Sequence, residues 1–161
     1  MRGHVTVHMA APPEAVWSLV SDVTQIGRYS PETFEAEWLG GATGPAPGAR
    51  FRGHVKRNGR GPTYWSECEV TEAEPGRSFA FAVVAGGRTI NTWRYDLAAA
   101  GGGTDVTESF ALDENPLTRG YWALLGRWRG KTNERGMRAT LERIRAEVER
   151  PAQSDGEAQT S

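Results

Sequence analysis

One acidic residue stands in the middle of an apolar strand face. Glu108 lies between Val106 and Phe110 in an alternating segment, so it shares their face of the predicted strand. A carboxylate without a partner is costly on such a face, and burial raises its pKa. A carboxyl group of raised pKa suits a general acid or base acting on an enolisable carbonyl. The alternatives are that Glu108 pairs with Arg94 or another arginine, or that a bulge turns it outward.

Aromatic and small polar side chains recur on the same faces of the neighbouring predicted strands. A large apolar wall with a few convergent polar groups is typical of a small-molecule site, although such side chains also form ordinary cores. We take Glu108 and Tyr64 as the candidate proton-transfer residues. The candidate ligand-binding residues are Tyr64, Ser66, Cys68, Phe81, Trp93, Tyr95, Glu108, Phe110, Trp122, Asn133 and Met137.

The other reactive residue types give weaker signals. Cys68 alternates with Val70 on an apolar face, which is typical of an inert core thiol. His4 and His8 share a strand face but lie about 13 Å apart by strand rise, too far for one metal ion. We therefore predict neither a metal site nor a cofactor.

The elements that must position these residues follow from alternation and turn residues. A strand over His4–Met9 runs into a helix that Pro12 or Pro13 starts, and a second short helix ends near Tyr29, before Ser30-Pro31. Six further alternating segments follow between about 33 and 112. Glycine- and proline-containing turns separate them, which predicts an antiparallel meander of seven strands.

The segment Leu117–Glu149 contains no proline and predicts one long C-terminal helix. Its apolar face is ordinary core in the second half, whereas the first half carries small or polar residues. Those residues either allow close packing on the sheet or leave room for a ligand. The opposite side of the first half carries a second apolar group that packs under loops, forms a dimer contact or serves as a lid. The two groups are Gly126, Gly130 and Asn133, and Tyr121, Leu124, Leu125 and Trp128.

Length and composition set the outer limits. The 161 residues predict one domain over 1–150 and a polar, disordered tail over 151–161. A net charge of −1 argues against nucleic-acid binding by the whole chain. The single cysteine, the absence of a signal peptide and the absence of any long apolar window predict a cytoplasmic protein without a transmembrane segment. The basic face of the last helix is either solvated or docks an acidic carrier protein or an anionic membrane.

Several motifs together resemble the START-like (SRPBCC) superfamily, specifically its bacterial polyketide cyclase/dehydrase-like branch. The resemblance covers about Gly3 to Glu149, nearly the whole chain. The motifs that carry it are Ala10-Ala11-Pro12-Pro13-Glu14-Ala15-Val16-Trp17, Cys68-Glu69-Val70-Thr71-Glu72-Ala73-Glu74-Pro75-Gly76-Arg77, Trp93-Arg94-Tyr95, Gly103-Thr104-Asp105-Val106-Thr107-Glu108-Ser109-Phe110 and Met137-Arg138-Ala139-Thr140-Leu141-Glu142-Arg143-Ile144.

The resemblance implies an α+β helix-grip fold, in which a seven-stranded antiparallel sheet wraps around a long C-terminal helix and two short helices follow strand 1. It also implies a deep apolar cavity, since members bind lipids, polyketides or other hydrophobic molecules. The aromatases of this superfamily resemble the chain at Trp93 and Ser66. Their arginine two positions after that serine is Cys68 here, and their tryptophan four positions before it is Pro62.

Three functional hypotheses follow. The first is a module that binds a hydrophobic small molecule, such as a polyketide, a lipid or another aromatic or acyl ligand, between sheet and C-terminal helix. The second is a polyketide cyclase/aromatase or dehydratase that uses Glu108 and Tyr64 for proton transfer and receives its substrate from an acyl carrier protein. The third is an interaction protein that uses the face of Tyr121, Leu125 and Trp128, including a homodimer contact.

Overall fold

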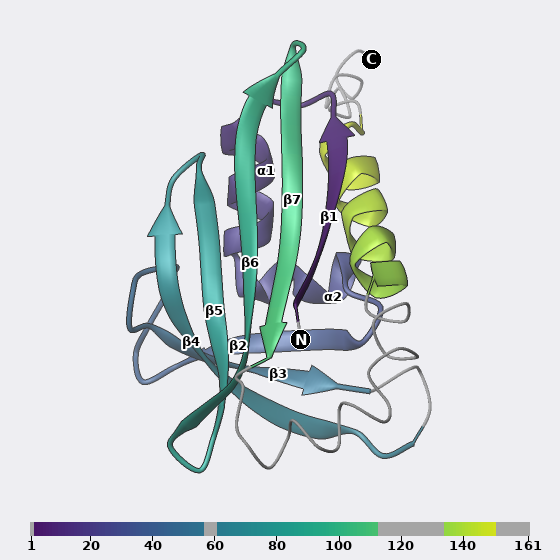
Figure 1. Ribbon diagram of the computed structural model, residues 1–161. Helices are drawn as coiled ribbons and strands as arrows, with labels where there is room; N and C mark the ends of the chain where they lie inside the picture. The colour runs from purple at the N-terminus through teal and green to yellow at the C-terminus, as the bar shows by residue number, and fades with distance from the viewer. Residues whose placement is uncertain (1, 57–60, 113–133, 151–161) are drawn as a thin grey trace, which may run out of the picture.

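A computed structural model describes residues 2–56, 61–112 and 134–150 of the chain (Figure 1). Two predicted ligand-binding residues, Trp122 and Asn133, lie outside these ranges. The second apolar group of the predicted helix, at 121–128, and the predicted polar tail at 151–161 also lie outside them. The described ranges contain the sheet, the short helices and a C-terminal helix over residues 134–148.

The seven strands form one antiparallel sheet, as predicted. The strands lie in the order β1-β7-β6-β5-β4-β3-β2, so hairpins connect β2 to β7 in sequence and β1 closes the far edge on β7. The sheet is strongly bent, with β2 and β3 crossing below the upright strands (Figure 1). The strand bounds are β1 Arg2–Met9, β2 Thr33–Leu39, β3 Arg50–Val55, β4 Tyr64–Glu74, β5 Ser78–Ala85, β6 Arg88–Ala100 and β7 Gly103–Leu112.

Three short helical segments follow β1: α1 (Pro13–Ser21), η1 (Val23–Gln25) and α2 (Ile26–Tyr29). The proline at the start of α1 stands where no intrahelical N–H bond is needed. The side chain of Asp22 accepts a hydrogen bond from the backbone N–H of Thr24 and thereby caps η1. On α1, the indole N–H of Trp17 donates to the Ser78 carbonyl at 2.9 Å, which ties the helix to β5.

The C-terminal helix is described over residues 134–148 and lies beside β1 (Figure 1). Its apolar side buries Met137, Leu141 and Ile144 completely in the core. The helix end is held by polar contacts, because Glu149 accepts a hydrogen bond from the backbone N–H of Ala10 at 2.7 Å. The predicted apolar stripe of this half is therefore confirmed, and so is the helix-grip class of the fold.

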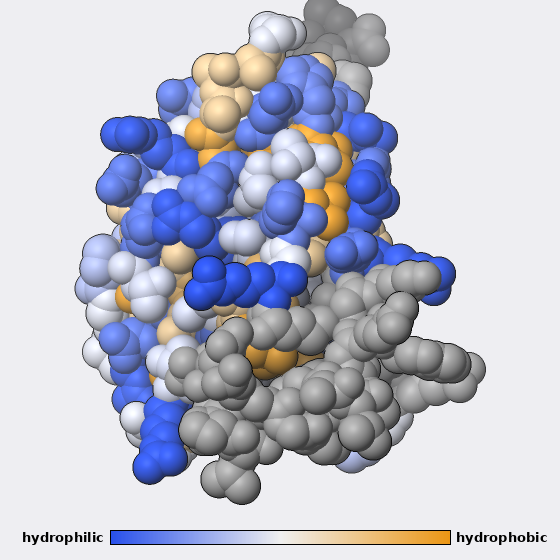
Figure 2. Space-filling view, in the orientation of Figure 1, coloured by the Kyte–Doolittle hydropathy of each residue, from blue (hydrophilic) through white to orange (hydrophobic). Residues whose placement is uncertain are grey.

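The two faces of the sheet differ in chemistry. The inner face carries the core side chains of β1, β5, β6 and β7, which the helices cover. The outer face carries ion pairs, among them Arg94 with Glu72 and Asp96. Figure 2 shows a mostly hydrophilic surface over β6 and β7, with apolar atoms visible where β1 meets the C-terminal helix. No helix in the described part of the chain is long and apolar enough to cross a membrane.

One side chain of β2 departs from the predicted alternation. Phe34 is 47% exposed, because a bulge between Thr33 and Glu35 turns it away from the core side of Ala36 and Trp38. Its ring lies 4.3 Å from the ring of His54, which in turn stacks on Trp65 at 4.5 Å. The outer face of β2, β3 and β4 therefore displays an exposed aromatic cluster.

Candidate functional site

A buried carboxyl–phenol pair lies at the centre of the inner face. The β6–β7 register places Tyr95 opposite Glu108, and the Tyr95 hydroxyl donates to Glu108 Oε1 at 3.0 Å. Glu108 is 3% exposed, and its second oxygen, Oε2, has no hydrogen-bond partner among the described residues. Arg94 does not neutralise this carboxyl group, because it points to the other face and binds Glu72 and Asp96. The inward placement of Glu108 is therefore the one that occurs, and the predicted alternatives of a pair with Arg94 or an outward turn do not.

Burial dominates the electrostatics of this pair. Loss of hydration raises the pKa of Glu108 to about 8, against a smaller lowering effect of the hydrogen bond from Tyr95. The pKa of Tyr95 is raised well above its ordinary value, first by burial and then by the negative charge of Glu108. At neutral pH the carboxyl group is therefore mostly protonated. A neutral carboxylic acid inside an apolar site can donate a hydrogen bond or a proton.

A second buried phenol, Tyr29, lies near this pair and was missed by sequence reasoning. Tyr29 ends α2 and is fully buried, and its hydroxyl reaches the Val20 carbonyl at 3.5 Å. Burial raises its pKa, and the charge of Glu108 adds to this effect. The sequence carries no periodic signal for this placement, because α1 ends at Ser21 and the extended residue Asp22 separates it from η1 and α2.

An aromatic pair lies next along the same two strands. Trp93 faces Phe110 in the β6–β7 register, and their ring centroids are 4.7 Å apart. Phe110 is buried, whereas Trp93 is only partly buried against the core. Phe81 lies opposite Trp93 on β5 and packs edge-on against Phe51 of β3. The predicted residues Phe81, Trp93 and Phe110, together with Phe51, thus form one aromatic wall across four strands.

The residue beyond Trp93 on the inner side of β6 is polar. Asn91 lies opposite Leu112, and its buried side-chain oxygen has no hydrogen-bond partner among the described residues. The alternation Asn91, Trp93, Tyr95 is present in the sequence, but Asn91 is not among the predicted site residues. Asn91 therefore adds a second buried polar group to the same face, beyond those predicted.

The predicted residues of β4 are spread along the strand. Cys68 is buried and faces Phe51, whereas Ser66 is half-buried opposite Gly53. Tyr64, at the start of β4, is 44% exposed and pairs with Val55. It lies four residues before Cys68 on the same strand, and among the described residues it is Tyr95, not Tyr64, that hydrogen-bonds to Glu108. The proton-transfer role assigned to Tyr64 thus stays a prediction, with Tyr95 as the phenol that binds the carboxyl group.

The thiol of Cys68 is poorly suited to nucleophilic chemistry. Burial raises its pKa to about 12, and the nearby Glu67 carboxylate adds to the shift. The thiol is therefore protonated at neutral pH, whereas the thiolate is the nucleophile. In the described part of the chain, no group of three or more His, Cys, Asp or Glu side chains could hold a metal ion.

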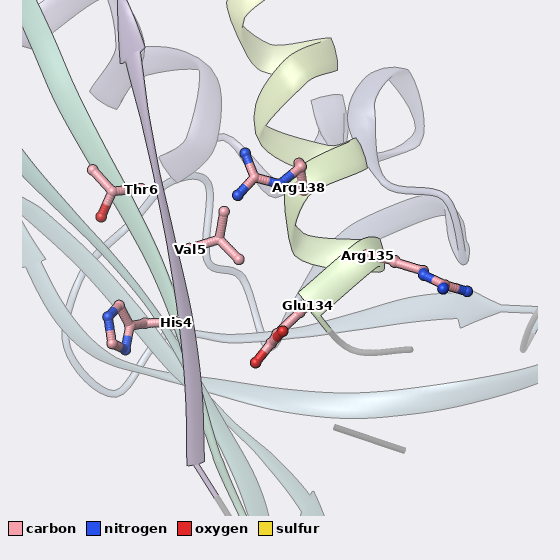
Figure 3. A pocket seen from close by; sticks show the side chains of 6 residues that line it. All are labelled: His4, Val5, Thr6, Glu134, Arg135 and Arg138. Carbon is pink, nitrogen blue, oxygen red and sulfur yellow. The ribbon is translucent and has the colours of Figure 1, made fainter. Parts of the chain in front are cut away.

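A groove of about 440 Å³ opens between β1 and the C-terminal helix. Val5, Glu134 and Arg138 lie in the space between strand and helix, whereas Arg135 points away (Figure 3). Neither arginine forms an ion pair with another described residue. Val5 is the register partner of Glu108, and a Cβ on the neighbouring Gly3 would contact the Met137 methyl at 3.5 Å. The groove thus reaches the strand segment beside the buried carboxyl group.

Comparisons with known proteins agree with this architecture. The family model described as "Polyketide cyclase / dehydrase and lipid transport" matches residues 2–149. A polyketide-cyclase-like protein from Corynebacterium glutamicum is 28% identical, with 91% of this chain and 86% of that chain covered and a TM-score of 0.52. No curated protein matches the sequence significantly.

Two further solved structures show the same fold at lower identity. A protein from Deinococcus radiodurans is 19% identical, with 91% of this chain and 96% of that chain covered and a TM-score of 0.64. An AHSA1-like protein from Aeromonas hydrophila is also 19% identical, with 92% of each chain covered and a TM-score of 0.61.

Proposed function

Since the chain belongs to the polyketide cyclase/dehydrase and lipid transport family, we propose that it binds a hydrophobic small molecule on the inner face of its sheet. The ligand lies against the Trp93–Phe110 pair, between the sheet and the C-terminal helix. The observation that carries this proposal is the buried carboxyl group of Glu108, whose Oε2 lacks a partner in the described part of the chain. An unpartnered buried polar atom is costly, and a ligand that bonds to it removes that cost.

Affinity and orientation come from different groups in this proposal. Removing apolar ligand surface from water supplies most of the binding free energy, at about 25 cal/mol per Å². The aromatic wall of Phe51, Phe81, Trp93 and Phe110 provides the complementary apolar surface. Glu108, held by Tyr95, then fixes the position of one polar group of the ligand.

A fluorescent apolar probe tests the location of this site. We expect N-phenyl-1-naphthylamine to bind saturably and to raise the melting temperature of the protein. Trp93→Ala should raise the dissociation constant of the probe about tenfold, because a stacking surface of the inner face is lost. Trp65→Ala is the matched control, since Trp65 is 42% exposed on the outer face and should leave the dissociation constant unchanged. The measurement is a fluorescence titration of the three proteins.

Two results would contradict the proposal. One is the absence of saturable probe binding by the wild-type protein. The other is an equal loss of affinity in the Trp65 and Trp93 variants, which would place the probe away from the inner face. Native mass spectrometry after gentle purification gives an independent reading, because a ligand carried through purification adds a defined mass.

The second candidate function is that of a polyketide cyclase or dehydratase, and the raised pKa of Glu108 favours it. A carboxyl group with a pKa of about 8 is a proton donor at neutral pH. In an intramolecular aldol step, an enol carbon bonds to a ketone carbon while Glu108 gives its proton to the ketone oxygen. The enol hydroxyl proton then returns to Glu108. Tyr95 acts here as a positioning residue that orients the carboxyl group.

The glutamine variant tests the catalytic candidate. With a carrier-bound poly-β-ketone, Glu108→Gln should lower product formation by about 10²- to 10⁴-fold, because an amide cannot supply the proton. The rate of the wild-type protein should fall above about pH 8, where the acid form is lost. Binding of the naphthylamine probe by the variant should stay within the wild-type range. A variant with undiminished turnover would remove Glu108 from the chemistry and leave the binding proposal intact.

A further inference from the structure

Three residue pairs of β6 and β7, at every second position of the register, give the inner face a pattern of polar, aromatic and polar groups. The first pair is Tyr95 with Glu108, the second is Trp93 with Phe110, and the third is Asn91 with Leu112. No register shift interrupts the two strands over this stretch, so the inward side chains of all three pairs share one face.

Both polar pairs contain a buried oxygen with no hydrogen-bond partner in the described part of the chain. These oxygens are Glu108 Oε2 and Asn91 Oδ1. Each carries the cost of a desolvated polar atom in the free protein, and two such atoms on one face, with a partly buried tryptophan between them, fit one elongated ligand.

The two oxygens require hydrogen-bond partners of opposite kinds. Tyr95 already donates to Glu108 Oε1, so the proton of the neutral acid is presented at Oε2 and requires an acceptor. The amide oxygen of Asn91 is itself an acceptor and requires a donor. A ligand that satisfies both therefore carries a carbonyl oxygen at one end and a hydroxyl or N–H group at the other.

Strand geometry sets the length of such a ligand. Tyr95 lies four positions after Asn91, which corresponds to about 13 Å along the strand. A hydrogen bond of about 2.8 Å at each end leaves about 8 Å between the two polar atoms of the ligand. A scaffold of two linearly fused rings spans this separation, and a single ring is shorter.

We propose that Asn91 and Glu108 form a two-point site for an elongated aromatic ketone that carries a hydroxyl group at its far end. Asn91 is the specificity-determining residue, because it distinguishes the hydroxylated molecule from its bare analogue. The inference rests on the proposed function, since it assigns the chemical class of ligand to the same inner face.

Four simple compounds test both the polarity and the length. They are 6-hydroxy-2-acetylnaphthalene, 2-acetylnaphthalene, 4-hydroxyacetophenone and acetophenone, and the measurement is the dissociation constant by calorimetry. In the wild-type protein, the hydroxyl group should increase the affinity for the two-ring ketone about tenfold. The same hydroxyl group should give no gain on the single ring, which is too short to reach Asn91.

The variants separate the two anchoring points. Asn91→Leu should abolish the gain in affinity from the hydroxyl group and leave the dissociation constant of 2-acetylnaphthalene unchanged. Glu108→Leu should lower the affinity for both two-ring ketones about tenfold. Glu108→Gln retains a hydrogen-bond donor at the same position and should bind both ketones. An undiminished hydroxyl gain in Asn91→Leu would overturn the inference, as would equal affinities for the two naphthalenes in the wild-type protein.

The naphthylamine probe distinguishes the two possible failures. If that probe binds in a Trp93-dependent manner but the hydroxyl group gives no gain, the two-point site is wrong and the hydrophobic-ligand proposal stands. If neither the probe nor any ketone binds saturably, the proposed function and the inference fail together.

Discussion

Replacing Glu108 with glutamine is expected to stabilise the free protein by about 4 kcal/mol near pH 8, with little effect near pH 4. In the unfolded chain this carboxyl group titrates near 4.5, whereas its pKa in the folded protein is about 8. Between these values the folded protein holds a proton that the unfolded chain has released, so stability falls as pH rises. Each pKa unit corresponds to about 1.4 kcal/mol, and glutamine has no proton to lose. Urea denaturation at a series of pH values measures the effect.

The same substitution at Glu72 is the control. Hydrogen bonds from Arg94 and Ser78 lower the pKa of Glu72, so its charged form stabilises the folded protein at neutral pH. Glu72→Gln should therefore destabilise the protein at pH 7, and the difference should disappear as pH falls and the carboxyl group becomes protonated. A wild-type protein whose stability does not decline between pH 5 and pH 8 relative to Glu108→Gln would show that Glu108 is hydrated or paired.

Leu141→Ala is expected to lower the free energy of unfolding by about 3–4 kcal/mol. Leu141 has no exposed surface and lies between Met137 and Ile144 on the core side of the C-terminal helix. Truncating such a leucine loses the burial of its side chain and leaves a cavity that the surroundings fill only in part. Urea denaturation at constant pH measures the loss, and the slope with denaturant should stay unchanged.

An alanine elsewhere in the same helix separates packing from helix propensity. A Cβ at Gly136 would meet no atom within 4 Å, so Gly136→Ala should stabilise the protein by about 0.5–1 kcal/mol. The two variants thus place alanine in the same helix, and the expected changes in the free energy of unfolding have opposite signs. A negligible loss for Leu141→Ala would mean that the described half of the helix is not a structural part of the core.

The alternation of apolar residues was sufficient to predict the sheet and much of its inner face. Trp93, Tyr95 and Phe110 point inward as the period-two pattern indicates, because one face of a curved sheet must be buried. Phe34 does not share the face of Ala36 and Trp38 that the alternation indicates, since the sequence carries no sign of the bulge that adds one residue to β2. Strand periodicity is a local property, whereas a bulge depends on the partner strand.

The candidate site was predictable in its centre and incomplete at its margins. The burial of Glu108 followed from its apolar neighbours, but its partner Tyr95 is 13 residues away and is set by the β6–β7 register. Asn91 was missed because a lone asparagine beyond a turn gives no strand signal. Tyr29 was not predicted as a neighbour of the carboxyl group, because only tertiary packing brings α2 close to Glu108.

The pairing of β1 with β7 has a consequence for the biosynthesis of this protein. Arg2 lies opposite Ala111 in the register. β1 therefore cannot pair with β7 until more than a hundred residues have been translated. Until then the apolar side of β1 is exposed outside the ribosome without its partner strand. Contacts of such long sequence separation also form slowly. The nascent chain is consequently exposed to aggregation for most of its synthesis, and the final helical segment completes the core only at the end.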